Sequence, residues 1–272
     1  MTNRLDASGY ETDKALHTHY LRSYEQYFDK LRDKEVRLLE LGVYKGGSLL
    51  LWRDYFQKGL IVGLDLNPVQ LNDLSGRIRT YSGQQQDTNL LDRIGAETAP
   101  GGFDVIIDDC SHIGELTRIS FWQLFDNHLK PGGLFVIEDW STGYWDSWFD
   151  GVNFQPDRKN GFSPGLFRFR SLMAQLYLST LANRLPLAQK FVVGLKRVIN
   201  RRQFRSHDYG LVGFIKELVD ECGMADITRP DLGRPPQRRS KFQEMRISPG
   251  QVFIVKASDV PCGDKPPVEH LG

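Results

Sequence analysis

The sequence predicts an α/β fold in which a doubly wound, mostly parallel sheet is covered by helices on both faces. Apolar runs alternate with helix-like segments from residue 36 to about residue 138, which is the pattern of parallel strands joined by crossover helices. These runs are continuously apolar, as in LIVGLDL and GLFVIED, which is typical of strands buried on both faces. At 272 residues the chain is long enough to bury one large core of this kind.

Five strands are expected in this region. They are residues 37–41, 61–66, 78–82, 105–108 and 134–138, with Pro131-Gly132-Gly133 as a turn before the last of them. Residues 20–31 carry aromatic and apolar side chains at helical spacing, which predicts an amphipathic helix ahead of the sheet. Later in the chain we expect a helix at residues 211–222 and a returning strand at residues 251–257.

This pattern predicts three parts of the chain. They are an N-terminal helical segment (1–35), a main domain (36–260) with a cap inserted at about 141–210, and a tail (261–272). Within the cap, residues 158–205 form a basic stretch with eleven Arg or Lys and no Asp or Glu. Two interpretations stay open: a helical cap with solvent-facing charges, or a lid or interface that meets an acidic, phosphorylated or membrane-borne substrate.

The composition excludes several classes of protein. A formal net charge of +1 gives no general attraction to nucleic acid. Three cysteines without CxxC spacing indicate neither a disulfide framework nor a thiolate zinc site. The polar N-terminus lacks the apolar core of a signal peptide, and no apolar stretch approaches the ~18 residues of a membrane span. We therefore expect a cytoplasmic protein without a transmembrane segment, with self-association as a homo-oligomer.

The first strand runs into a glycine-rich loop. Glu40 stands two residues before Gly42, and Gly46, Gly47 and Ser48 follow. This spacing differs from the GxGxxG of dinucleotide-binding proteins and matches the E/D-x-G-x-x-x-G loop of class I methyltransferases. S-adenosylmethionine carries positive charge and no phosphate, so a carboxylate can offset its charge while the glycines let the backbone approach it closely. A glycine-rich turn without a ligand is the alternative.

Further acids follow the next strands. Asp65 ends the second strand, where an acid can accept both ribose hydroxyls. Asp87 follows the third strand and is placed either to contact the adenine amino group or to cap a helix that begins at Thr88. Because the carboxyl ends of parallel strands share one edge, Glu40, Asp65 and Asp87 are expected together there. Asp108, at the end of the fourth strand, is expected to face the cofactor.

Four carboxylates crowd two neighbouring strand ends, in IIDDCSH and VIED. Adjacent strands lie ~4.8 Å apart, so these acids would repel one another without a compensating cation. Oxygen ligands favour Mg²⁺ over Zn²⁺. We expect Asp109, Glu138 and Asp139 to be the metal ligands, with helix capping or pairing with arginines as the alternative. His112 lies three residues after Asp109 and is expected to be the general base, since an imidazole accepts protons near neutral pH.

These motifs resemble the macrocin O-methyltransferase family, which includes mycinamicin-type macrolide sugar 2-O-methyltransferases. The resemblance is carried by VRLLELGVYKGGSLLLWRDYF, IVGLDLN, FDVIIDDCSH and KPGGLFVIEDWSTGYW, from roughly residue 12 to residue 146. It implies S-adenosylmethionine and Mg²⁺ as cofactors and a sugar hydroxyl of a glycoside, glycolipid or polysaccharide as the acceptor. It also implies the same roles for the residues chosen above, although Cys110 stands where relatives usually have glycine.

The aromatic run WSTGYWDSW follows the last acids. Aromatic faces stack on sugar rings, so Trp140, Tyr144 and Trp145 are expected to wall the acceptor site, with plain core packing as the alternative.

Two other functions fit the same fold. An NAD-dependent oxidoreductase would need a different glycine loop, and a non-catalytic cofactor-binding subunit would have no need to keep the acids and His112.

Overall fold

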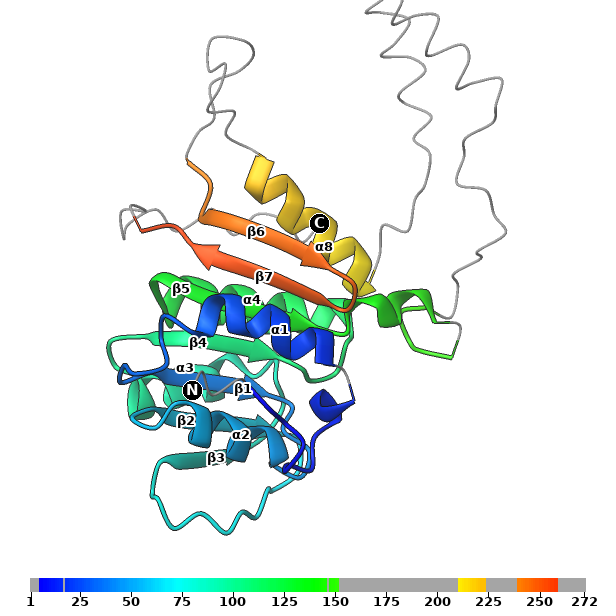
Figure 1. The fold of residues 1–272 in the computed structure, drawn as a ribbon. Helices are drawn as coiled ribbons and strands as arrows, with labels where there is room; N and C mark the ends of the chain where they lie inside the picture. The colour runs from blue at the N-terminus through cyan, green and yellow to red at the C-terminus, as the bar shows by residue number, and fades with distance from the viewer. Residues whose placement is uncertain (1–4, 17, 146, 152–209, 224–238, 259–272) are drawn as a thin grey trace, which may run out of the picture. The chain divides into compact units, whose positions relative to one another are not determined.

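The computed structural model describes residues 5–16, 18–145, 147–151, 210–223 and 239–258 (Figure 1). A seven-stranded sheet forms its centre, in the order β3-β2-β1-β4-β5-β7-β6. The strands are β1 (Arg37–Leu41), β2 (Leu60–Asp65), β3 (Ile78–Ser82), β4 (Phe103–Asp108), β5 (Leu129–Glu138), β6 (Phe242–Ser248) and β7 (Gln251–Lys256). The first five strands pair in parallel, whereas β7 is antiparallel to both β5 and β6. The predicted doubly wound, mostly parallel sheet is therefore confirmed.

Helices cover the two faces of this sheet (Figure 1). One face packs against α1 (Thr18–Phe28) and α2 (Gly47–Tyr55), and the other packs against α3 (Thr88–Thr98), α4 (Gly114–Asn127) and α8 (Gly210–Gly223). Two 3-10 helices complete the description: η1 (Asp13–Ala15) precedes α1, and η2 (Trp140–Tyr144) follows β5. No described helix is long and apolar enough to cross a membrane.

Aromatic side chains fasten α1 to the sheet. Tyr24 and Phe28 lie one helical turn apart on α1, are fully buried, and pack against Trp52 of α2 at ring centroid distances of 5.2 and 5.5 Å. Tyr24 also contacts Phe253 of β7 edge to face at 5.6 Å. Burying a large apolar side chain contributes roughly 1.5–3 kcal/mol, so this cluster holds α1 against α2 and β7.

The observed elements differ from the predicted ones at three places. Pro131-Gly132-Gly133 does not form a separate turn but lies inside β5, where the register against β4 shifts and the extra residues are taken up as a bulge. The N-terminal helix ends at Phe28, and Leu31 reaches the same core from the following turn, so its position mimicked helical spacing. Strand β6 was not predicted, because FQEMRIS is polar and forms the sheet edge.

The predicted cap falls largely outside the described residues, because the structure describes nothing between residues 151 and 210. The basic stretch 158–205 and the tail 261–272 lie outside them as well, so these interpretations stay predictions.

The loops after β1 and β4 approach each other closely. Gly42 has a φ of 80°, and a Cβ at this position would lie 2.1 Å from the carbonyl oxygen of Asp109. The Asp109 amide donates to the Leu41 carbonyl at 2.9 Å, which holds the two strand ends together. Only a residue without a side chain permits this contact, so Gly42 sets the spacing between the glycine loop and the acidic loop.

We predict that Gly42→Ala destabilises the protein more than Gly76→Ala does. Both glycines have positive φ, but a Cβ at Gly76 meets nothing within 4 Å. The backbone penalty is shared, and the clash at Gly42 should lower the free energy of unfolding by roughly 1–3 kcal/mol more. Urea denaturation of the two variants measures the difference, and equal losses would show that the acidic loop yields without cost.

Candidate active site

Asp65 holds the glycine loop after β1. Its Oδ2 accepts hydrogen bonds from the amides of Val43 and Tyr44 at 3.1 and 3.0 Å, and its Oδ1 accepts from the amide of Asn67 at 3.0 Å. Each carboxylate oxygen can accept more than one hydrogen bond, so the side chain that shapes the loop also keeps acceptor capacity for a ligand. The ribose contact predicted for Asp65 is compatible with this geometry and stays a prediction.

Asp87 caps α3, as one of its two interpretations predicted. Its Oδ1 accepts from the amide of Leu90 at 3.1 Å, and the side chain is exposed. Its contact with adenine stays a prediction.

Asp108 is buried on the side of the sheet that carries α4. It accepts from Ser120 Oγ at 3.0 Å and from Gln85 Nε2 at 3.2 and 3.3 Å. Burial raises the pKa of Asp108 against the opposing effect of these donors. Gln85 also accepts from the amide of Ser111 at 3.1 Å, so it fixes the loop that carries Asp109 and His112. Sequence reasoning missed Gln85, because it stands in a run of three glutamines with no signal that distinguishes the buried one.

Glu40 lies on the opposite face of the sheet, toward α1 and α2. It is fully buried and accepts from Ser48 Oγ at 2.7 Å and from Trp52 Nε1 at 3.2 Å. Burial raises its pKa, while Lys14, 3.4 Å away, acts against the shift. Glu40 and Ser48 thus form a buried layer beneath the glycine loop, and the cofactor contacts predicted for them and for the loop glycines stay predictions.

Lys14 is the centre of this buried layer, and sequence reasoning missed it. Only 1 % of the residue is exposed, and Nζ lies 2.6 Å from Asp109 Oδ2, 2.9 Å from Glu138 Oε2 and 3.4 Å from Glu40 Oε1. Burial by itself would lower the pKa of Lys14, but the three carboxylates outweigh it and hold the pKa well above its ordinary value. The ammonium group therefore stays charged and links the ends of β1, β4 and β5.

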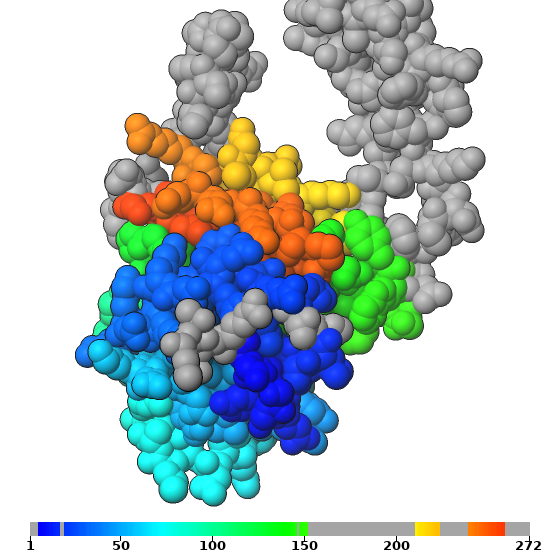
Figure 2. Space-filling model, in the orientation of Figure 1, coloured from blue at the N-terminus to red at the C-terminus, as the bar shows by residue number. Residues whose placement is uncertain are grey.

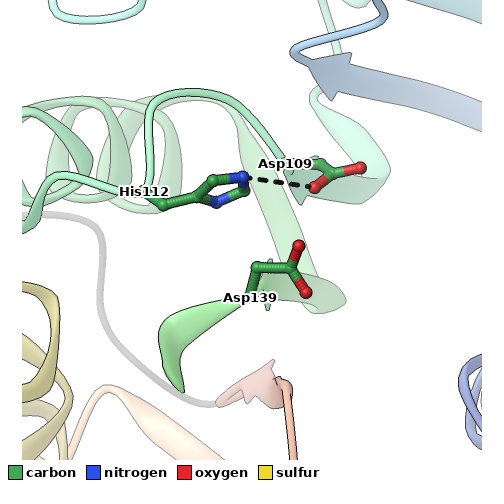
Figure 3. Close-up of side chains that lie close together, drawn as sticks. All are labelled: Asp109, His112 and Asp139. Atoms are coloured by element: carbon green, nitrogen blue, oxygen red, sulfur yellow. Dashed lines mark ion pairs between the residues drawn. The ribbon is translucent and has the colours of Figure 1, made fainter. Parts of the chain in front are cut away.

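Asp109, His112 and Asp139 form a candidate cation site at the carboxyl edge of the sheet (Figure 3). One ligand atom from each lies within 4.8 Å of the others, and His112 Nε2 is 4.0 Å from Asp109 Oδ1. Glu138, the third predicted ligand, instead contacts Lys14, accepts from Tyr24 Oη at 2.5 Å and accepts from Gln251 Nε2 at 3.2 Å. Its role as a metal ligand stays a prediction.

Backbone strain gathers at the same edge. Tyr44, His112 and Asp139 have φ values of 48°, 54° and 51°, and among the residues the structure describes they are the non-glycine residues with positive φ. They follow β1, β4 and β5 respectively. Such conformations persist where the surroundings enforce them, and they gather at functional sites.

The aromatic run after β5 divides into an anchored and an exposed part. Trp140 donates from Nε1 to the carbonyl of Ser248 at 2.9 Å and, partly buried, packs against the core. Its predicted role in the acceptor site stays a prediction. Tyr144 and Trp145 are 37 % and 52 % exposed, and Trp148 lies 6.0 Å from the His112 ring. Figure 2 shows this segment (green) at the surface beside the β6–β7 pair (orange).

The strain at His112 generates a stability prediction. His112→Gly should be about 1 kcal/mol more stable than His112→Ala, because a left-handed conformation costs alanine roughly 1–2 kcal/mol, partly offset by the greater entropy that glycine loses on folding. The same pair of substitutions at His128, whose φ is −127°, should show no such gain for glycine. Chemical denaturation measures both pairs, and an alanine variant as stable as the glycine variant at residue 112 would argue against stored strain.

Comparison with known proteins gives the following relatives. No protein-family model matches the chain. The chain is 42% identical over 171 residues to the mycinamicin VI 2''-O-methyltransferase of Micromonospora griseorubida, and the aligned region covers 60% of this chain and 41% of the relative. It is 37% identical over 211 residues to the demethylmacrocin O-methyltransferase of Streptomyces fradiae, and this aligned region covers 74% of this chain and 49% of the relative. The chain thus spans about half, or less, of these relatives' length.

The solved structures agree with the sequence relatives. The structure of the MycE methyltransferase from the mycinamycin biosynthetic pathway, in complex with Mg, SAH and mycinamycin VI, superposes with a TM-score of 0.56 at 30% identity and covers 88% of this chain and 48% of MycE. The resemblance that the motifs predicted is confirmed: over the part it shares with them, this chain is a homologue of the macrolide sugar O-methyltransferases, and its fold is that of the class I S-adenosylmethionine-dependent methyltransferases.

Proposed function

We propose that this chain transfers a methyl group from S-adenosylmethionine to a sugar hydroxyl of a glycoside or oligosaccharide, with Mg²⁺ bound at the carboxyl edge of the sheet. The observation that carries the proposal is the convergence of Asp109, His112 and Asp139, with ligand atoms within 4.8 Å of one another, beside a methyltransferase-type glycine loop. MycE, which is solved with Mg and SAH, supports both cofactors for a chain of this fold.

The residues present fit a hard divalent cation. Carboxylate oxygens are the donors that Mg²⁺ prefers, and Asp109 and Glu138 already converge on one positive charge, the ammonium group of Lys14. Asp109, Asp139 and Glu138 would hold the ion. When bound, Mg²⁺ supplies orientation of the acceptor and a lower pKa for its hydroxyl group.

His112 takes the proton of the acceptor hydroxyl in the proposed reaction. The acceptor oxygen attacks the methyl carbon in line with the sulfonium, so the new C–O bond forms as the S–CH₃ bond breaks and S-adenosylhomocysteine leaves. The imidazolium that results lies beside Asp109, 4.0 Å from Oδ1, and this carboxylate stabilises its charge. The reaction needs no other co-reactant, and orientation supplies a large part of the rate.

The cofactor and the acceptor would approach the acids from different elements. Asp65 ends β2 and the exposed Asp87 follows β3, both on the side of the glycine loop, and they would hold the nucleoside part. The exposed rings of Tyr144 and Trp145 follow β5 and would stack on the sugar. Mycinamicin VI and demethylmacrocin appear in the names of two relatives, which supports a macrolide-type glycoside as the first acceptor to test.

We predict that methyl transfer depends on both Mg²⁺ and His112. Mass spectrometry of deoxysugar glycosides incubated with S-adenosylmethionine and Mg²⁺ should show a mass gain of one methylene unit, and EDTA should abolish it. His112→Ala should lower kcat by ~10²–10⁴, the usual contribution of a general base. His128→Ala is the matched control, because His128 pairs with Asp92 away from the site. Full activity in EDTA, or a His112→Ala enzyme as fast as the control, would contradict the mechanism.

We also predict which cofactor binds. Calorimetry should detect S-adenosylhomocysteine, and Asp65→Ala should weaken its binding by ~1.5–3 kcal/mol through the loss of charge-assisted hydrogen bonds. Asp92→Ala, which removes a carboxylate from the outer surface of α3, should leave the affinity unchanged. Tight binding of NAD without a response to S-adenosylhomocysteine would instead favour an oxidoreductase.

A further inference from the structure

The N-terminal segment supplies a donor to each of the three predicted metal ligands. These contacts join Lys14 Nζ to Asp109 Oδ2 (2.6 Å) and Glu138 Oε2 (2.9 Å), Tyr24 Oη to Glu138 Oε1 (2.5 Å), and Tyr20 Oη to Asp139 Oδ1 (2.6 Å). All three donors come from η1 and α1, whereas Asp109 follows β4, Glu138 ends β5 and Asp139 comes directly after it. Core packing alone does not explain these four contacts, because apolar side chains would bury the same face of the sheet without directing polar atoms at the acids.

The geometry of α1 produces this arrangement. Tyr20 and Tyr24 are four residues apart, so they project from one side of the helix toward the end of β5, where Glu138 and Asp139 lie. A Cβ at Gly250 would lie 1.8 Å from the Tyr20 hydroxyl oxygen, so the turn between β6 and β7 confines the phenol against Asp139. Lys14 enters from η1 and is buried together with Glu138, whereas the Asp109 side chain is 12% exposed. The donors are therefore held rigidly by elements on both sides.

We propose that Lys14, Tyr20 and Tyr24 form the outer shell of the divalent-cation site, which makes the N-terminal segment part of the metal centre. The inference rests on the proposed function, since it concerns the same site. Outer-shell donors fix the orientation of ligating carboxylates, and their removal typically weakens metal binding by roughly 10- to 100-fold. Lys14 engages Oδ2 of Asp109, which leaves Oδ1 on the side of His112. Its charge also lowers the repulsion among acids that must converge on one ion.

These are positioning residues, and the alternative is that they stabilise the fold alone. Tyr27 distinguishes the two, because it lies on the same helix and donates in the same way, at 2.8 Å, but to Glu244 of β6. Tyr20→Phe and Tyr27→Phe each remove one hydroxyl from a phenol–carboxylate hydrogen bond. Their effects on thermal stability should be similar, whereas only Tyr20→Phe should act on the cation.

The test is Mn²⁺ binding to the full chain saturated with S-adenosylhomocysteine, measured by electron paramagnetic resonance without an acceptor. Tyr20→Phe should bind Mn²⁺ roughly 10- to 100-fold more weakly and should alter the Mn²⁺ line shape. Tyr27→Phe should match the unchanged protein in both respects. Tyr24→Phe and Lys14→Met extend the test, and Tyr20→Phe decides it if the buried substitutions fail to fold.

The possible results separate the two proposals. If the unchanged protein binds Mn²⁺ and Tyr20→Phe binds it with equal affinity and line shape, the outer-shell role is overturned while the metal-dependent function stands. If the unchanged protein binds no Mn²⁺, both are overturned. A loss in Tyr20→Phe that Tyr27→Phe shows equally would assign the effect to the stability of α1 and overturn the outer-shell role.

Discussion

A single buried ammonium group joins the N-terminal segment to the three central strand ends of this protein. Lys14 lies between carboxylates that come from β1, from the end of β5 and from the loop after β4, and these three strands are neighbours in the sheet. Burying one unpaired charge is costly, and removing one partner of a buried pair typically costs about 3–5 kcal/mol. The cluster is therefore stable only when all of its members are in place, which couples the position of η1 to the geometry of the acidic edge.

The functional loops stand on this buried layer. Glu40 connects it to α2 through Ser48 and Trp52, and Glu138 connects it to β7 through Gln251. Above the layer, the residues with positive φ hold conformations that an isolated loop would leave. The ion pairs and hydrogen bonds of the buried layer stabilise the strand ends, and this stabilisation offsets the backbone strain of the loops that follow them.

The sequence was informative about where strands end and much less about which face each side chain takes. Continuous apolar runs and the glycine loop predicted the sheet and its carboxyl edge, and the spacing of Asp109 and His112 predicted their proximity. The alternation along β1 could also have shown that Glu40 lies on the opposite face from Leu39 and Leu41, and so belongs to a buried layer. Lys14 had no local signal, because its contact with Asp109 spans 95 residues and depends on how η1 folds over the sheet. Gln85 and the polar edge strand β6 were missed for the same reason: tertiary contacts, and not their own sequence, give them their place.

The insertion of β7 between β5 and β6 has a consequence for how the chain matures. Strands β1 to β5 come from one continuous stretch of the sequence, residues 37–138, and they pair in parallel with one another without any contribution from β7. The backbone groups of Leu134–Glu138 on the outer side of β5 have their hydrogen-bond partners in β7. This strand is synthesised only after all residues from Asp139 to Gly250. An open strand edge of this kind is prone to pair with another chain. Because Gln251 and the turn at Gly250 also confine Glu138 and Tyr20, the acids gain their final surroundings only when this last hairpin closes over them.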